Sequence, residues 1–271
     1  MKTQKLLILI LTLWTTNAYC QDGEIQTVRK QILEEGLFLF RLEKASWNST
    51  DLLVKDHSTL VNQVAGYVSY PANDDTKTIF WNTDGKILFT VTLDSTGAEN
   101  KSIVDVNIRT ATQQEAELIK LRKDAFDFLT KNEDNFFAFY KNTSRNLVPF
   151  IKNDQRAVFI LTASREKKLL IGNDYRLLFN DKNEVIKKEK LHNSLITINQ
   201  DAKETNEVGS MHTHILEDHP YMTSTDICTF MLYREVFKLK NHVVISDKGT
   251  SIFESEKKNL IIVPQDRAMK K

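Results

Sequence analysis

The sequence predicts an α+β fold, and three observations support this class. The composition is that of a globular protein, with 271 residues of which 41% are hydrophobic and 27% charged. Short runs rich in β-branched and aromatic residues, bounded by turn residues, occupy most of residues 36–109 and recur after residue 146. One long stretch between these two parts carries apolar residues at helical spacing. We therefore expect an antiparallel N-terminal sheet, a linking helix and a C-terminal mixed sheet.

The predicted organisation has four segments. Residues 1–20 read as a signal peptide, 21–110 as a β-rich N-terminal domain, 111–145 as a helical segment and 146–271 as the C-terminal domain. No low-complexity linker separates them. We expect the two halves to pack closely.

The first segment has the three parts of an export signal. A short basic start precedes an apolar core from Leu6 to Trp14, and a polar stretch with small residues follows. Cleavage is expected after Ala18 or after Cys20, and lipid attachment at Cys20 is a third possibility. The core is shorter than the ~20 apolar residues that span a bilayer. These features predict an exported bacterial protein, periplasmic or secreted, without a membrane span.

The charge balance excludes a main role in nucleic-acid binding. The chain has 37 Lys and Arg against 36 Asp and Glu, a formal charge of +1. Removal of Lys2 and Lys5 with the signal leaves 35 against 36, or −1. No net field then attracts DNA, RNA or an anionic membrane. Cys228 would be the only remaining thiol, and its apolar surroundings in sequence predict a buried, unreactive side chain.

The N-terminal half begins with a charged helix over residues 21–35 and continues as strands. Residues 36–42 and 66–70 are rich in aromatic and aliphatic side chains, which favours strands. Residues 78–81 and 86–93 flank a turn containing Asp84-Gly85, a strong hairpin signal. We expect the aromatic residues of this half to form core.

The middle and C-terminal parts of the chain are expected to contain both helices and strands. Residues 112–140 predict a long helix with a break near Asn132, and a boundary is expected around residues 142–149. Strands are then expected at 156–163, 169–171, 175–179, 184–190, 195–198, 207–215, 242–253 (a hairpin) and 259–263, with a helix at 224–238.

One constellation in the C-terminal part can carry chemistry. His212 and His214 are two residues apart on a predicted strand, so their side chains share a face. Asp226 follows after eleven residues, at the start of the next predicted helix. Two His and one carboxylate with an open position is a catalytic zinc arrangement, in which the metal lowers the pKa of its bound water toward ~7. The sequence predicts one Zn²⁺ ion on these three residues.

This pattern resembles the signature of the JAMM/MPN-type metalloproteases. That signature is His-x-His followed by an Asp, with a Ser before the Asp and an upstream Glu. The resemblance covers roughly residues 150–265 and implies a zinc-dependent hydrolase that cleaves peptide or isopeptide bonds in a protein or peptide substrate. It implies that Thr223, by spacing, or Ser224, by residue type, stabilises the oxyanion. The alternative is a non-catalytic exported module that keeps the fold.

The upstream Glu of the family has no clear counterpart. Glu166 lies at a plausible distance before His212 but within a polar turn, and Glu184 belongs to a charged hairpin. Glu166 is the candidate general acid and base, and Asp174 could stand in for it.

Structural interpretations of the same residues remain open. Thr223 and Asp226 have the spacing of a helix capping box, and His212 and His214 could be ordinary histidines of a sheet. His219 is expected in solvent or over the site, and His192 is expected to be structural.

Overall fold

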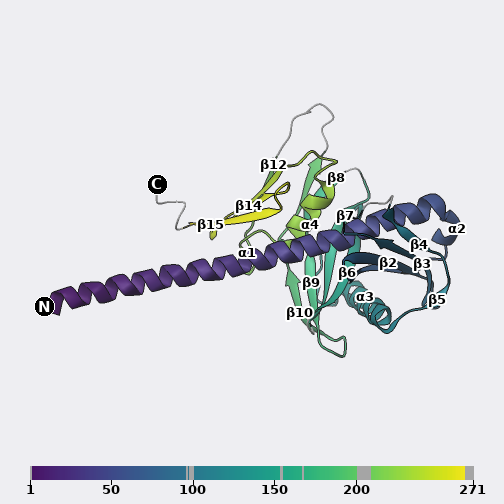
Figure 1. Ribbon diagram of the computed structural model, residues 1–271, viewed down its shortest axis with the longest axis horizontal. Helices are drawn as coiled ribbons and strands as arrows, with labels where there is room; N and C mark the ends of the chain where they lie inside the picture. The colour runs from purple at the N-terminus through teal and green to yellow at the C-terminus, as the bar shows by residue number, and fades with distance from the viewer. Residues whose placement is uncertain are drawn as a thin grey trace.

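The computed structural model describes residues 2–95, 97, 101–152, 155–166, 168–199 and 209–265, with side-chain detail from Gly23 onward (Figure 1). An antiparallel sheet comes first in the chain and a mixed sheet comes last, so the predicted α+β class is confirmed. Among the described residues, no helix has a stretch long and apolar enough to cross a membrane.

The first element is the long helix α1, Lys2–Asp56, which runs past all the sheets in Figure 1 and is followed by the short α2, Ser58–Val61. The strand predicted at residues 36–42 is therefore wrong. Leu39, Leu42 and Ala45 are buried at intervals of about one helical turn, and Leu53 follows two turns later. Different faces of α1 enter three hydrophobic clusters. A helix that is buried on several sides is apolar around much of its circumference, and this hides the helical period that distinguishes it from a strand.

The first sheet is an antiparallel meander, β1-β2-β3-β4, to which β5 adds beside β3. Its predicted hairpin is confirmed, because β2 pairs antiparallel with β3 on either side of residues 82–85. Gly85 has a positive φ of 77°, the backbone conformation that this turn requires. The strands are β1 Gly66–Ala72, β2 Asp75–Trp81, β3 Lys86–Leu93, β4 Ile103–Asp105 and β5 Arg109–Thr110.

Helix α3, Gln113–Lys131, lies between the first and second sheets. Leu118 and Ile119 pack into the cluster of the first sheet, whereas Leu121, Ala125 and Leu129 pack into that of the second. The helix begins with a capping box at Thr112 and ends where Asn132 adopts the left-handed conformation, at the predicted break. The following Phe residues are not helical: Phe137 packs against Tyr175 in the core cluster of the second sheet.

The second sheet has the order β10-β9-β7-β6, and all its neighbours are antiparallel. Its edge strand β6, Thr143–Lys152, includes Pro149 and occupies the region predicted as a domain boundary. The boundary placed at residues 145/146 thus falls inside a strand. The other strands are β7 Gln155–Ser164, β9 Tyr175–Phe179 and β10 Val185–Lys190; a separate pair is formed by β8 Lys168–Gly172 and β11 Leu195–Asn199.

The last sheet, β12-β13-β14-β15, is mixed. Strand β12 runs parallel to β13, and the other pairs are antiparallel. Helix α4 connects β12 to β13 and ends at Tyr233, earlier than predicted. The bounds are β12 Gly209–Thr213, α4 Ser224–Tyr233, β13 Asn241–Ile245, β14 Gly249–Glu254 and β15 Asn259–Pro264.

Helix α1 packs directly on α4, and this contact positions the helix that carries Asp226. Ile32, Leu33 and Leu37 of α1 lie against the cluster that contains Ile227 and Phe230 of α4. Gly36 lies at the closest approach, since a Cβ added there would be 2.7 Å from the Cβ of Ile227 and 2.9 Å from the carbonyl oxygen of Ser224.

Candidate metal centre

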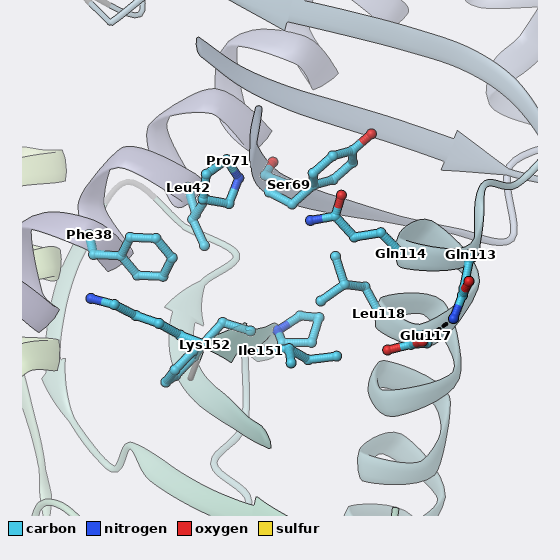
Figure 2. Close-up of a pocket in the computed structure, with 13 residues that line it drawn as sticks. Phe38, Leu42, Ser69, Pro71, Gln113, Gln114, Glu117, Leu118, Ile151 and Lys152 are labelled. Atoms are coloured by element: carbon cyan, nitrogen blue, oxygen red, sulfur yellow. Dashed lines mark hydrogen bonds between the residues drawn. The ribbon is translucent and has the colours of Figure 1, made fainter. Parts of the chain in front are cut away.

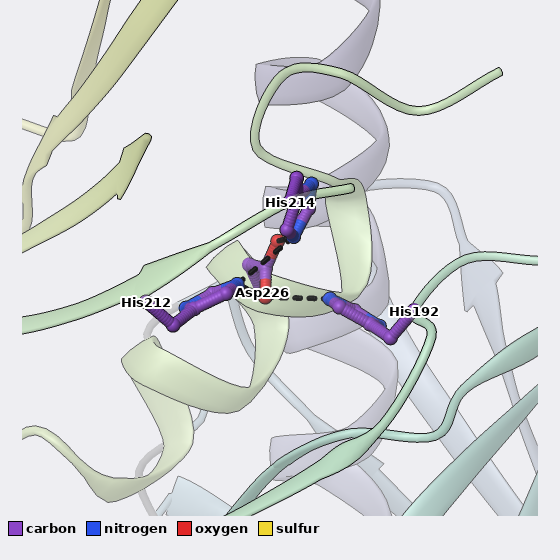
Figure 3. A group of neighbouring side chains, drawn as sticks. All are labelled: His192, His212, His214 and Asp226. Carbon is purple, nitrogen blue, oxygen red and sulfur yellow. Dashed lines mark hydrogen bonds and ion pairs between the residues drawn. The ribbon is translucent and has the colours of Figure 1, made fainter. Parts of the chain in front are cut away.

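Four buried side chains form a group that could hold a metal ion: His192, His212, His214 and Asp226. One ligand atom from each lies within 4.8 Å of all the others. Figure 3 shows the imidazoles of His212 and His214, from one segment, and that of His192, from another, directed at the carboxylate of Asp226. The group therefore contains all three predicted metal ligands and one histidine that the sequence analysis assigned to structure.

The two histidines of the motif come from the end of β12. His212 pairs in register with Val244 of the parallel strand β13, and the His214 amide continues the ladder by donating to the Ile245 carbonyl at 2.9 Å. The strand alternation therefore directs both rings to one face, as predicted from their spacing. Their Nε2 atoms are 2.9 Å apart.

Asp226 occupies the N3 position of α4, in a complete capping box. Its amide donates to Thr223 Oγ1 at 3.2 Å, and its Oδ2 accepts from the Thr223 amide at 2.8 Å. The capping interpretation is thus correct, and it coexists with the metal interpretation. Oδ1 accepts from His192 Nε2 at 2.8 Å and lies 3.5 Å from His212 Nε2, while Oδ2 lies 3.5 Å from His214 Nε2.

His192 reaches the group from the loop between β10 and β11. The amide of the preceding Leu191 donates to the backbone carbonyl of Asp174 at 2.9 Å, which holds this loop against the turn between β8 and β9. On its other side, His192 Nδ1 faces Asp174 Oδ2 at 3.6 Å. No motif in the sequence marks His192, because only the pairing of β10 with β9 and of β11 with β8 brings this loop to the site.

The imidazoles have supporting groups of the kind that surround metal ligands. His214 Nδ1 donates to the carbonyl oxygens of His219 and Tyr221, both at 2.9 Å, which leaves Nε2 free of its proton in the neutral ring. Asp174 Oδ1 accepts from the Thr162 amide at 2.9 Å, so this carboxylate is fixed behind His192.

His242 lies beyond the motif. It is fully buried, its ring centroid is 4.9 Å from that of His212, and its Nδ1 is paired with Ser210 Oγ at 2.8 Å. His242 is therefore a further buried imidazole beside His212, but it does not belong to the group of four.

Burial and the mutual charges of the group shift its pKa values in opposite directions. Burial lowers the pKa of His212 to about 3, against the attraction of Asp226. Burial also lowers the pKa of His214. For His192, burial is outweighed by the carboxylates of Asp226 and Asp174, and the pKa is raised.

The two carboxyl groups also differ. For Asp226, burial is outweighed by the nearby histidines, above all His192, which hold its pKa well below the ordinary value. For Asp174, burial dominates and raises the pKa to about 6. The lowered pKa of Asp226 favours its ionised form, and the lowered pKa values of His212 and His214 favour neutral imidazoles beside it; metal ligands have these charge states.

The donor set and its spacing fit a small divalent cation. Nitrogen and carboxylate ligands at 2.0–2.1 Å from a tetrahedral zinc ion are about 3.3 Å from one another. The nearest-neighbour distances in the group, 2.8 to 3.5 Å, bracket this value. A small cavity of about 80 Å³, lined by His192, His212 and His214, adjoins the group.

The remaining predicted site residues are placed differently. Thr223 contacts the group, with Oγ1 2.9 Å from Asp226 Oδ2 and 3.5 Å from His192 Nε2. Ser224 is buried and lines a cavity of about 470 Å³ between α1 and residues 218–224.

Glu166 is not in the group: its exposed carboxylate accepts from Lys168 at 2.7 Å and from Asn142 at 2.9 Å. His219 is half-buried and lines the same cavity as Ser224. Cys228 is buried, as predicted.

Comparisons with protein-family models, with the sequences of curated proteins and with solved structures found no match for this chain.

Proposed function

We propose that the chain is an exported zinc-dependent hydrolase of peptide or isopeptide bonds, with His212, His214 and Asp226 as the protein ligands of one zinc ion. The observation that carries the proposal is the convergence of these three side chains, with His192, on one buried point beside a cavity. The similarity of the His-x-His and Asp pattern to that of the JAMM/MPN-type metalloproteases supports the reaction class. Bound zinc supplies a Lewis acid that polarises a carbonyl and activates water.

His192 is the proposed general base and general acid. His192 Nε2 is directed into the group, and on the other side of the ring the buried carboxylate of Asp174 faces Nδ1 at 3.6 Å, beyond hydrogen-bond distance. A base must lie within hydrogen-bond reach of the water whose proton it takes, and among the predicted candidates Glu166 is held at the surface instead. In the proposed reaction, binding of zinc by Asp226 would displace the proton that His192 Nε2 donates to that carboxylate, and the neutral His192 would then take a proton from the attacking water and return it to the leaving nitrogen.

Thr223 has a positioning role in this scheme. Its hydroxyl caps α4 and donates to Asp226 Oδ2, so it orients the carboxylate ligand. Thr223 Oγ1 lies 2.9 Å from Asp226 Oδ2 and 3.5 Å from His192 Nε2, and this contact with the group favours Thr223 over Ser224 as the hydroxyl residue of the site.

A second function is favoured by the same four residues. If His192 is a fourth ligand, the coordination sphere is closed by protein and the metal stabilises the fold without catalysis. The metal would then link the loop at His192, strand β12 and helix α4. This corresponds to a non-catalytic exported module.

Cobalt substitution distinguishes these functions without knowledge of the substrate. The zinc is replaced by Co²⁺, whose visible spectrum reports the ligands, and a hydroxamate is added. A hydrolase with an open position shows a spectral change on addition of the hydroxamate, whereas a closed four-ligand site shows none. The His192→Gln variant should keep its metal if His192 is a base and lose it if His192 is a ligand.

The corresponding activity test uses a library of fluorogenic peptide and isopeptide substrates. We expect His192→Gln to lower the turnover by about 10²- to 10⁴-fold, the usual contribution of general acid–base catalysis. His57→Gln is the matched control, because His57 packs on Phe89 and is not in the group. Metal loss in His192→Gln, together with no response to the hydroxamate, would exclude the hydrolase and leave the stabilising site.

A further inference from the structure

Another cavity, larger than the one at the metal centre, lies between the two antiparallel sheets. It has a volume of about 640 Å³ and is bounded by α1, β1, α3 and β6. Figure 2 shows these four elements around it, with Leu118 projecting inward from α3. Volumes of 300–1,000 Å³ are typical of sites for small organic ligands.

The walls of this cavity are mainly apolar. Phe38 and Leu42 of α1, Leu118 of α3 and Ile151 of β6 face one another across it, and Pro71 and Pro149 complete the wall. Phe38 is fixed by an edge-to-face contact with Phe150, at 5.9 Å between ring centroids. Leu42 and Leu118 are already buried, whereas Phe38 and Ile151 are half-buried. An apolar chain or ring placed here would remove the exposed part of Phe38 and Ile151 from water, which favours binding.

Most polar groups of the lining already have partners inside the protein. Ser69 Oγ is hydrogen-bonded to Ser46 and Thr78, and the Tyr70 hydroxyl donates to Glu115. The carboxylate of Glu117 lies 3.5 Å from Arg156 and accepts from Gln113. These groups therefore contribute no unmatched charge to a ligand.

Two polar side chains of the lining have no hydrogen bond or ion pair with any residue that the structure describes. They are Lys152, whose ammonium extends beside Phe38 in Figure 2, and Gln114, whose amide is directed into the cavity. Lys152 is the only Lys or Arg among the lining residues, and it stands where the apolar wall ends. An ammonium at the end of an apolar cavity complements a ligand with an apolar body and one terminal negative charge.

We propose that this cavity binds a small amphipathic carboxylate of the medium-chain fatty acid type. The acyl chain lies against Phe38, Leu42, Leu118 and Ile151, and the carboxylate accepts a hydrogen bond from Lys152. The site is independent of the metal centre, because none of the four metal-site residues lines it.

Isothermal titration of the full chain with decanoate, below its micelle concentration, tests the proposal. Decanol and decyltrimethylammonium are the matched neutral and cationic probes. We expect saturable binding of one decanoate per chain with a negative heat-capacity change, the signature of apolar burial. Loss of the charged hydrogen bond in Lys152→Gln should weaken decanoate binding about tenfold and leave decanol unchanged.

Two further variants, beside Lys152→Gln, make the test specific. Gln114→Trp places a large side chain at the exposed edge of the cavity and should abolish binding of both decanoate and decanol. Lys123→Gln removes an exposed lysine of α3 that does not line the cavity, and it should bind like the wild type. The zinc content of all three variants should equal that of the wild type.

The proposal fails if decanoate does not saturate at one site or if decyltrimethylammonium binds as tightly. It also fails if Lys152→Gln and Gln114→Trp both bind like Lys123→Gln. These outcomes are separate from those at the metal centre, since they are measured by titration with zinc content unchanged.

Discussion

Replacement of Gly36 by Ala tests the contact between α1 and α4 directly. In an exposed part of a helix, Gly→Ala is favourable by about 1 kcal/mol. At Gly36, however, the added Cβ would lie 2.7 and 2.9 Å from two carbons of Ile227 and 2.9 Å from the Ser224 carbonyl oxygen, where ordinary contacts are 3.4–4 Å. One of these neighbours is backbone, so the side chain alone cannot relieve the contact and α4 must move by several tenths of an ångström.

The helical preference of Ala and the close contacts of its Cβ have opposite effects, and their relative sizes decide whether Gly36→Ala raises or lowers the free energy of unfolding. Overpacking of this kind costs about 1–3 kcal/mol, which exceeds the helical gain of about 1 kcal/mol. We therefore expect Gly36→Ala to lower the free energy of unfolding by about 1 kcal/mol, measured by urea denaturation at constant m value. Because Ser224 opens the helix that carries Asp226, zinc affinity should fall as well.

Gly23→Ala is the matched control in the same helix. A Cβ at Gly23 meets no atom within 4 Å, so only the helical preference remains. We expect Gly23→Ala to leave the free energy of unfolding unchanged or to raise it by up to about 1 kcal/mol. Equal stabilisation by both substitutions would refute the close packing of α1 on α4.

Three further expectations concern single side chains. Burial raises the pKa of Glu43 to about 7 from 4.5, so its contribution to stability is present below pH 4.5 and is lost as the pH rises through 7. Glu43→Gln should therefore stabilise the protein at pH 8, by about 3 kcal/mol at most, but not at pH 4, as followed by urea denaturation. Thr223→Val removes the cap of α4 and should lower the free energy of unfolding by about 1 kcal/mol and weaken zinc binding. Thr223→Ser should retain both the stability and the zinc affinity of the wild type, so equal zinc affinity in the two variants would contradict the orienting role of the hydroxyl. Glu166→Gln should change neither the zinc content nor the turnover, because the Glu166 carboxylate lies at the surface. A large loss of turnover would instead show that Glu166 takes part in the reaction.

Local patterns predicted the strands well and α1 poorly. The Asp84-Gly85 turn and the alternation of residues 86–93 are properties of a few neighbouring residues, and the structure has the hairpin at that place. Residues 36–42 contain Leu, Phe, Leu and Phe in succession, which matches a buried strand as well as a helix that is enclosed on several sides. Only the packing of α1 against both α4 and the sheets distinguishes the enclosed helix from a buried strand.

Strand β6 was missed for a related reason. Asn142, Asn146 and Pro149 are turn-forming residues, and they predicted a boundary. In the structure, Pro149 lies on β6, which is the edge strand of its sheet, and an edge is where a proline without an amide proton is tolerated.

The metal centre shows the same division between local and distant information. His212 and His214 were predicted because two residues on one strand share a face, and Asp226 because a helix starts after a short loop. The sequence does not link His192 to this group, because it lies twenty residues before His212 and no fixed spacing joins the two. Its place depends on the pairing of β10 and β11 with strands on both sides of Asp174.

The zinc content of the purified chain tests the central claim most directly. It is measured by plasma mass spectrometry for the wild type and for the His212→Ala/His214→Ala double variant, both after exposure to zinc and removal of excess metal. We expect about one zinc ion per wild-type chain and none in the double variant, because the variant loses two of the three proposed ligands. Absence of metal from the wild type, or equal zinc in both proteins, would contradict the account and reduce the four residues to a buried hydrogen-bonded cluster.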